Sequence, residues 1–194
     1  HLLLAVCERM LGEHRQNAVE RVMSVLEKPV GSRVPLLKGI DCEVRYGTLY
    51  VGPPLSSSLP SLGGDVGVTV PGEACFGGWK LRVRGPHWML TSFPSSEWQA
   101  CLDAEAVGAE LTLGRRRPGD TFQPLGMEHE KKLQDFFVDA KVPREWRDRL
   151  PLLRSRGRIA WVPGWRIADW AKVGPETRAV LDLEMTRPEG VTIR

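Results

Sequence analysis

The sequence has little of what membrane, secreted or zinc-binding proteins depend on. No apolar run approaches the roughly 18 residues of a membrane-spanning helix. Cys7, Cys42, Cys75 and Cys101 are scattered, form no C-x-x-C pair and do not cluster with histidines, so we predict no metal ligands and a reducing, cytoplasmic environment. Residues 1–6 have neither an initiating Met nor a basic flank, which suggests a cut end rather than a signal peptide.

Charge is distributed unequally along the chain. Residues 1–110 carry 10 Lys/Arg against 12 Asp/Glu, whereas residues 111–194 carry 17 against 12. Within residues 115–166 the counts are 13 and 7. A basic second half favours a polyanionic partner, although such charge also occurs on solvated faces that bind nothing.

The chain is long enough for one or two domains with a core of their own, with 194 residues and 42% hydrophobic content. We expect a helix over residues 2–11 and a second one that begins with Asn17 as N-cap and Glu20 three residues later. Pro29 and Gly31 would end this second helix. Its predicted apolar stripe is Val19, Val22, Met23 and Leu26.

From about residue 34 the pattern becomes that of short strands. Apolar residues alternate over 42–46 and 49–51 around Gly47-Thr48, which predicts a hairpin, and residues 52–64 form a loop rich in Pro, Ser and Gly. Helices are predicted over 130–140 and from Pro143 to Leu150, with Phe136, Phe137, Trp146 and Trp161 in the core. Further strands are expected at 66–70, 79–84, 88–92, 109–114, 158–162 and 178–185.

The segment 111–153 concentrates cations at turns and at the starts of predicted helices. A strand leads into the turn Pro118-Gly119, which Asp120 can brace by accepting backbone N–H bonds. Rigid elements can aim cations from such positions at phosphates, and arginine suits bidentate contact. With Gly119 and Asp120 shaping the turn, the predicted RNA-binding residues are Arg115, Arg116, Arg117, Lys131, Lys132, Lys141, Arg144 and Arg147.

Several short motifs follow one another over about residues 101–186. They include Arg117-Pro118-Gly119-Asp120, Pro124-Leu125-Gly126, Lys131-Lys132-Leu133 with Phe136-Phe137, Lys141-Val142-Pro143, Pro151-Leu152-Leu153 and the run from Ile159 to Gly164. Their order and spacing resemble the C-terminal domain of bacterial tRNA(Ile)-lysidine synthetases. Residues 1–51 are similar, less specifically, to the end of the middle helical domain of that family.

The resemblance implies a fold, a domain layout and a partner. It implies an α+β, β-rich C-terminal domain of a three-layer, β-sandwich-like type, also seen in a phenylalanyl-tRNA synthetase subunit. That domain would cover residues 30–194, after a helical remnant of the middle domain at 1–29. The family uses ATP, with magnesium, to attach lysine to the wobble cytidine of the minor isoleucine tRNA with a CAU anticodon. Its C-terminal domains hold the tRNA, and the last one grips the acceptor stem.

The chemistry of the family resides in an S-G-G-x-D-S motif that this chain does not have. The most similar string, residues 61–65, lacks the final serine, has an extra leucine and lies in a Pro/Ser-rich loop. His14, His87 and His129 are isolated, so we expect them to be ordinary polar residues. We therefore predict a full-length parent that is an ATP-dependent ligase, and a chain that has no catalytic residue and no cofactor of its own.

Three departures from the family pattern lower the local positive charge. Glu128 and Glu130 flank His129 in a loop that is often Gly-rich. Thr121 stands where a basic residue is usual, and Gly114 precedes the arginine triplet where another cation would fit. These departures leave open how tightly this loop contacts RNA.

Two function classes remain. The first is an RNA-binding appendage of a tRNA-modifying ligase. Its affinity for RNA would fall steeply as the salt concentration rises. The second is a protein-interaction or dimerisation module, in which residues 1–27 mediate a salt-insensitive homodimer. An independent small enzyme has no residue constellation to support it.

Overall fold

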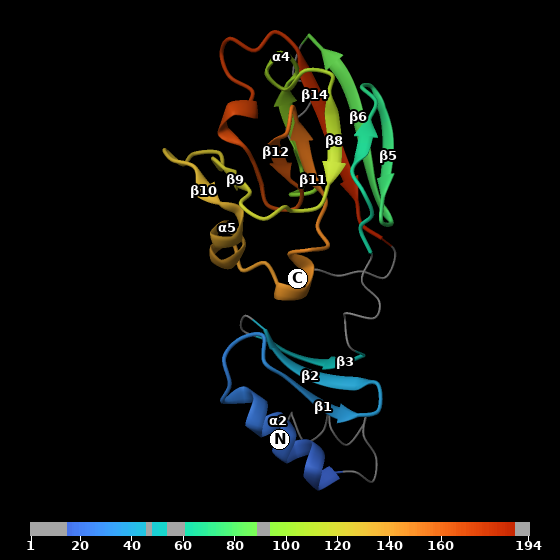
Figure 1. Ribbon diagram of the computed structural model, residues 1–194, viewed down its shortest axis with the longest axis vertical. Coiled ribbons are helices and arrows are strands. Elements are labelled where there is room, and N and C mark those ends of the chain that lie inside the picture. Colours follow the sequence, from blue (N-terminus) through green and yellow to red (C-terminus); the bar gives the residue numbers. More distant parts are fainter. Residues whose placement is uncertain (1–14, 46–47, 54–60, 89–93, 189–194) are drawn as a thin grey trace. The chain divides into compact units, whose positions relative to one another are not determined.

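The computed structural model describes residues 15–45, 48–53, 61–88 and 94–188 of the chain (Figure 1). By internal contacts the chain divides into two compact units. The first covers His1–Leu59 and the short segment Pro143–Glu145, and the second covers the rest. The helix predicted over residues 2–11 lies outside the described residues. How residues 1–29 and 30–194 correspond to the domains of a larger protein stays a prediction.

The first unit combines one helix with a small antiparallel sheet. Helix α2 covers Arg15–Leu26, and strands β1 (Arg33–Leu37), β2 (Ile40–Arg45) and β3 (Thr48–Gly52) pair in the order β1-β2-β3. The predicted hairpin is confirmed, because Cys42 pairs with Val51 and Val44 with Leu49.

The core of this unit forms between one face of the helix and the sheet. Val22 and Val25 are buried with Leu36 and Cys42. The predicted stripe was wrong at two positions, because Met23 is 53% exposed and Leu26 43% exposed. The helix turns its 22–25 ridge toward the strands, so these two side chains face away from them. Asn17 is not the N-cap, because it lies inside the helix, whose described part begins at Arg15.

The second unit contains two larger sheets and a short ribbon. The five-stranded sheet has the order β13-β12-β11-β8-β4, the four-stranded sheet β5-β6-β14-β7, and the ribbon β10-β9. The bounds are β4 Val66–Val68, β5 Gly72–Phe76, β6 Trp79–His87, β7 Gln99–Asp103, β8 Leu111–Gly114, β9 Thr121–Phe122, β10 Lys131–Lys132, β11 Leu152–Ser155, β12 Arg158–Val162, β13 Arg166–Ile167 and β14 Val180–Thr186. Short helical pieces join them: α4 Ala104–Val107, α5 Leu133–Asp139, and the 3-10 turns η1 Arg144–Trp146 and η2 Asp169–Ala171.

The two larger sheets lie against each other as layers of a sandwich (Figure 1). Burial alternates along β5 and β6, so the four-stranded sheet has one buried and one solvent-facing side. By contrast, β11 is buried throughout and β12 nearly so, since β9 and η2 cover the outer side of their sheet. This β-rich α+β architecture confirms the predicted fold class, and the four aromatic residues expected in the core are buried.

Some local predictions were wrong. Lys131 and Lys132 do not open a helix: they pair with Phe122 and Thr121 as strand β10, and α5 begins only at Leu133. The helix expected from Pro143 is only the 3-10 turn η1, although Trp146 is buried as predicted. Strands β5 and β7 were not foreseen, and most of the strand expected at 88–92 lies outside the described residues. Strand β12 has the predicted bounds.

Candidate nucleic-acid interface

The loop after β8 is a tight turn that Asp120 closes. The backbone N–H of Arg117 donates to Oδ2 of Asp120 at 2.6 Å, and the N–H of Asp120 donates to the carbonyl of Arg117 at 3.2 Å. Gly119 has a φ of +82°, a conformation that residues with a Cβ rarely adopt. The turn therefore holds Arg116 and Arg117 at a fixed place beyond the end of the strand.

A buried arginine supports the turn from within the fold. Arg154 of β11 donates from one terminal nitrogen to Oδ2 of Asp120 at 2.6 Å, and the two side chains are 2% and 12% exposed. The same nitrogen lies 3.4 Å from the carbonyl oxygen of Arg115. The sequence analysis missed Arg154. In the sequence it directly follows the apolar residues 151–153 and is one of three arginines within residues 154–158, so no local signal set it apart.

One open cavity of about 340 Å³, called the concave surface below, is lined by three of the eight predicted cations. They are Arg116, Arg117 and Lys132. Arg116 bonds to Asp148 through Nε and to the side-chain oxygen of Gln134 at 2.8 Å. Arg117 is paired with Asp65. Lys132 is exposed and has no ion-pair partner among the described residues.

The remaining predicted cations lie elsewhere. Lys131 is paired with Asp139, and its side chain is only 25% exposed. Arg147 is half-buried and donates from Nε to the carbonyl of Val142 at 3.0 Å. Exposed residues outside the concave surface are Arg115, Lys141 and Arg144.

The acidic partners of Arg116 and Arg117 are themselves accessible to water. The side chain of Asp148 is 69% exposed and that of Asp65 33% exposed. Ion pairs at a protein surface contribute only about 0–1 kcal/mol, so a phosphate can replace these carboxylates at little cost. Both arginines are thus held in place without being committed to their present partners.

Asp65 also explains why a glycine precedes the arginines. A Cβ on Gly114 would lie 2.5 Å from Oδ1 of Asp65, so any side chain there would displace the carboxylate that pairs with Arg117. The sequence analysis missed Asp65, which is 52 residues from its partner.

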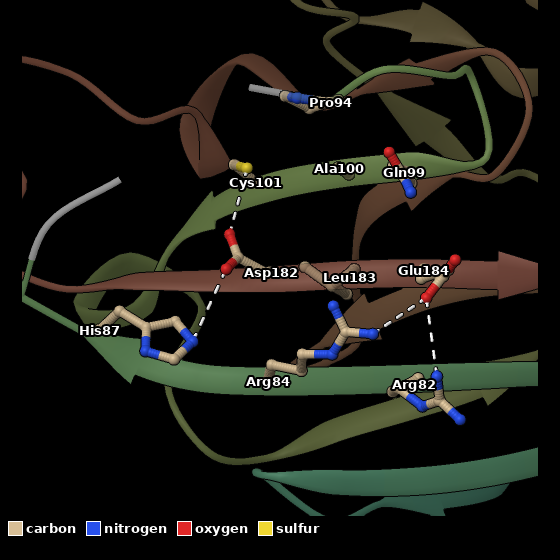
Figure 2. A pocket seen from close by; sticks show the side chains of 10 residues that line it. All are labelled: Arg82, Arg84, His87, Pro94, Gln99, Ala100, Cys101, Asp182, Leu183 and Glu184. Atoms are coloured by element: carbon tan, nitrogen blue, oxygen red, sulfur yellow. Dashed lines mark hydrogen bonds and ion pairs between the residues drawn. The ribbon is translucent and has the colours of Figure 1, made fainter. Parts of the chain in front are cut away.

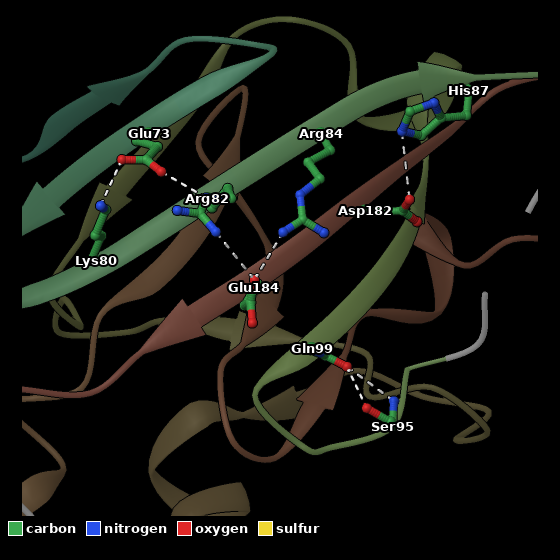
Figure 3. A network of polar contacts seen from close by, with 9 residues as sticks. All are labelled: Glu73, Lys80, Arg82, Arg84, His87, Ser95, Gln99, Asp182 and Glu184. Carbon is green, nitrogen blue, oxygen red and sulfur yellow. Dashed lines mark hydrogen bonds and ion pairs between the residues drawn. The ribbon is translucent and has the colours of Figure 1, made fainter. Parts of the chain in front are cut away.

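The solvent-facing side of the four-stranded sheet also carries many charges, but there they are matched (Figure 3). Glu73 accepts from Lys80 at 2.8 Å and from Arg82 at 2.7 Å. Glu184 lies 3.9 Å from Arg82 and 3.3 Å from Arg84. Hydrogen bonds from Lys80 and then Arg82 lower the pKa of Glu73 below its ordinary value, so this carboxylate is ionised at neutral pH. Each of these three cations thus lies beside a carboxylate on a neighbouring strand.

At one end of this face three chemically active residue types meet (Figure 2). The thiol of Cys101 donates to Oδ1 of Asp182 at 3.3 Å, and Oδ2 lies 3.6 Å from Nε2 of His87. Burial, followed by the bond to Asp182, raises the pKa of Cys101 to about 12. A cysteine nucleophile needs the opposite shift, so this thiol is not activated. The sequence analysis missed the cluster because its members come from three separate strands.

Two further classes of feature are absent from the described part of the chain. There, no three His, Cys, Asp or Glu side chains gather closely enough to hold a metal ion. No helix of these segments is long and apolar enough to cross a membrane.

The sandwich and its basic turn define a known class of domain. The family model for the "TilS substrate C-terminal domain" matches residues 111–183, which include the turn, the concave surface and Arg154. A crystal structure of a TILS C-terminal domain is similar in fold, with a TM-score of 0.52 and 25% sequence identity, covering 63% of this chain and 97% of that one.

Curated relatives identify the family. The tRNA(Ile)-lysidine synthase of Dehalococcoides mccartyi (strain CBDB1) is 34% identical over 190 residues, which is 95% of this chain and 40% of the relative. That of Caldanaerobacter subterraneus subsp. tengcongensis is 30% identical over 173 residues, covering 87% of this chain and 36% of the relative. The chain belongs to the tRNA(Ile)-lysidine synthase family and corresponds to its C-terminal part. It spans about 40% of the length of the first of these relatives.

Proposed function

We propose that this chain is the tRNA-binding part of a tRNA(Ile)-lysidine synthase. It would hold the acceptor stem of the minor isoleucine tRNA, with its CAU anticodon, while a ligase domain outside this chain attaches lysine to the wobble cytidine. The observation that carries the proposal is the concave surface with Arg116, Arg117 and Lys132, which lies within the family-matched segment.

The mode of recognition follows from the shape of RNA. An A-form helix hides the base edges of its major groove, so a protein recognises the stem through its shape, phosphates and 2′-hydroxyls. Arginines fixed by a braced turn suit bidentate phosphate contact, and Lys132 adds a mobile point charge. Arg115, next to Arg116 in the chain, is also exposed and would extend the contact.

The ligase chemistry is assigned to another part of the protein. Residues 61–65, the string most similar to the S-G-G-x-D-S motif, are irregular and lead into strand β4, whereas phosphate-binding loops lead from a strand into a helix. This string therefore does not fit ATP, and ATP, magnesium and lysine would bind outside the described residues. The role of this chain would be to position the RNA.

A second candidate function rests on the first unit. Met23, Leu26 and Val30 are exposed by 53%, 43% and 50%, and all lie on or just after helix α2. Such neighbouring apolar side chains suit a protein-protein contact, including a homodimer. This function would coexist with RNA binding, because it uses other residues.

The test is binding of the 194-residue chain to the minor isoleucine tRNA, with elongator methionine tRNA as competitor. If about five phosphates are contacted, the log–log salt slope is near −4, so affinity falls by about two orders of magnitude between about 50 and 200 mM salt. The triple variant Arg116→Ala/Arg117→Ala/Lys132→Ala should lose most of the binding.

A matched variant removes the same charge from the other surface. Lys80→Ala/Arg82→Ala/Arg84→Ala should bind tRNA nearly as well as the unmodified chain, because those cations lie outside the concave surface and outside the family-matched segment. Equal losses in the two triple variants would show that only net charge matters. Absence of binding at low salt, or salt-insensitive self-association alone, would favour the second candidate function.

A further inference from the structure

A second cavity, of about 380 Å³, opens beside strands β7 and β13. Each of these strands is the last one in its sheet, so the cavity lies where the two layers of the sandwich end next to each other. Its apolar lining includes Trp161, Trp165, Ile167, Leu125 and Ala100. The volume falls in the range of small-molecule sites, roughly 300–1,000 Å³.

The aromatic wall of the cavity is fixed by its neighbours. Trp165 meets the ring of Trp98 edge-on, with 6.1 Å between ring centroids and 76° between the planes. Gly164, next in the chain, has a φ of +83°, and a Cβ there would lie 2.6 Å from the ring of Trp98. Trp161 is 1% exposed, so it forms part of the floor. An incoming planar ring would therefore meet a preformed surface.

The mouth of the cavity carries a cation without a partner. Arg166 is exposed and has no ion pair or side-chain hydrogen bond among the described residues. Lys172 also lines the cavity but is held by Asp169 at 2.9 Å. Glu97 also lines the cavity. A free guanidinium over an apolar aromatic cavity fits a ligand that joins an anionic group to a flat ring.

We propose that this cavity binds one unpaired nucleotide of an RNA, with the base beside Trp165 and a phosphate at Arg166. The inference rests on the proposed RNA-binding function and adds a second contact to it. Aromatic side chains and arginine are what proteins use to hold unstacked bases. The five Cα–Cα steps from Asp120, at the basic turn, to Leu125, at the cavity, span at most about 18 Å, so one RNA molecule can reach both.

The test compares two RNA hairpins on the whole chain, one blunt and one with a short single-stranded extension that carries 2-aminopurine. A stacked base contributes enough that the extended hairpin should bind about tenfold more tightly, with quenched 2-aminopurine fluorescence. Arg166→Ala should remove most of this advantage and leave the blunt hairpin unaffected. Arg178→Ala is the matched control, because Arg178 is also exposed but does not line the cavity.

The outcomes separate this inference from the proposed function. If blunt and extended hairpins bind equally well and the fluorescence does not change, the nucleotide site is wrong while RNA binding stands. If neither hairpin binds at low salt, both proposals fall. Trp165→Leu, with its unfolding temperature checked to be unchanged, should weaken binding of the extended hairpin only. An equal loss of affinity for both hairpins would mean that the cavity maintains the fold and does not bind a nucleotide. A proline-rich peptide that binds there while the extension has no effect would assign the cavity to a protein partner.

Discussion

Two charged surfaces of the second unit contain similar residues and differ in how the charges are matched. On the four-stranded sheet, Arg82 lies directly between Glu73 and Glu184 on the neighbouring strands. Around the turn after β8, Arg116 and Arg117 each have one carboxylate from a segment distant in the sequence, whereas Arg115 and Lys132 have none among the described residues. The number of cations does not distinguish these surfaces, whereas the origin of their carboxylates does.

The difference follows from the local backbone. Residues opposite each other on paired strands are close enough for side chains to interact, so a regular sheet brings opposite charges together. A turn beyond the end of a strand has no paired strand beside it. Its cations therefore contact carboxylates only where a segment distant in the sequence lies against the turn. Turns therefore suit cations that must exchange partners, and sheets suit cations that stabilise the fold.

The largest expected effect comes from the buried pair below the basic turn. Arg154→Met leaves Asp120 nearly buried without its partner, which should lower the free energy of unfolding by about 3–5 kcal/mol and weaken tRNA binding. Urea denaturation and a binding titration would measure the two effects. Arg82→Met on the sheet should leave the unfolding midpoint nearly unchanged. Equal destabilisation by both variants would remove the distinction between the surfaces.

The next largest effect is expected when the carboxylates on the four-stranded sheet are removed, so that its cations lose their partners. Glu73→Gln/Glu184→Gln frees Arg82 and Arg84, so tRNA binding should tighten at low salt and the log–log salt slope steepen by about 1–2. Glu105→Gln/Glu176→Gln changes the net charge equally without freeing an arginine, because within the described part of the chain no ion pair joins these exposed residues to a cation. The same steepening in this control would mean that net charge alone sets affinity.

A smaller effect is expected where Arg116 is released from its present partner. Asp148→Asn removes the carboxylate that competes with phosphate, so tRNA should bind roughly two- to fivefold more tightly, in line with the modest strength of an exposed pair. Asp135→Asn, an exposed change on the neighbouring helix, should have less effect. Weaker binding of Asp148→Asn would instead show that Asp148 positions Arg116 for RNA.

The smallest effect concerns the titration of the matched face. The pKa of Glu73 should lie below its ordinary 4.5 and rise toward it in Lys80→Met/Arg82→Met, as followed by NMR of the side-chain carboxyl. Since the folded-state pKa is lowered, the stabilisation is present above about pH 4.5 and is lost as the pH falls through the lowered value. An unchanged pKa in the double variant would contradict the pairing.

In the candidate interface, contacts between residues close in the sequence could be predicted, whereas contacts between distant segments could not. The turn at Arg117–Asp120 depends on residues three apart, and its Gly and Asp are typical turn residues. Asp65 and Arg154, in contrast, reach the same turn from 52 and 34 residues away, and no local pattern indicates such contacts.

Tertiary pairing also overrode local preference. The apolar spacing of Leu133, Phe136 and Phe137 predicted a helix, and α5 confirms it. Lys131 and Lys132 fitted the same pattern but pair with β9, because Phe122 and Thr121 lie opposite them. The β-rich fold followed from the density of turn residues, while strand order depends on contacts between distant segments.

The two lysines of β10 show how strand pairing gives adjacent residues of the same type different surroundings. Successive side chains of a strand point to opposite sides, so Lys131 reaches Asp139 while Lys132 faces solvent at the concave surface. Their amines should therefore differ in chemical reactivity. An acylating reagent in limiting amount should modify Lys132 first, and bound RNA should shield that amine. One mass-spectrometric measurement of acylation at both residues would thus report on the fold through Lys131 and on bound RNA through Lys132.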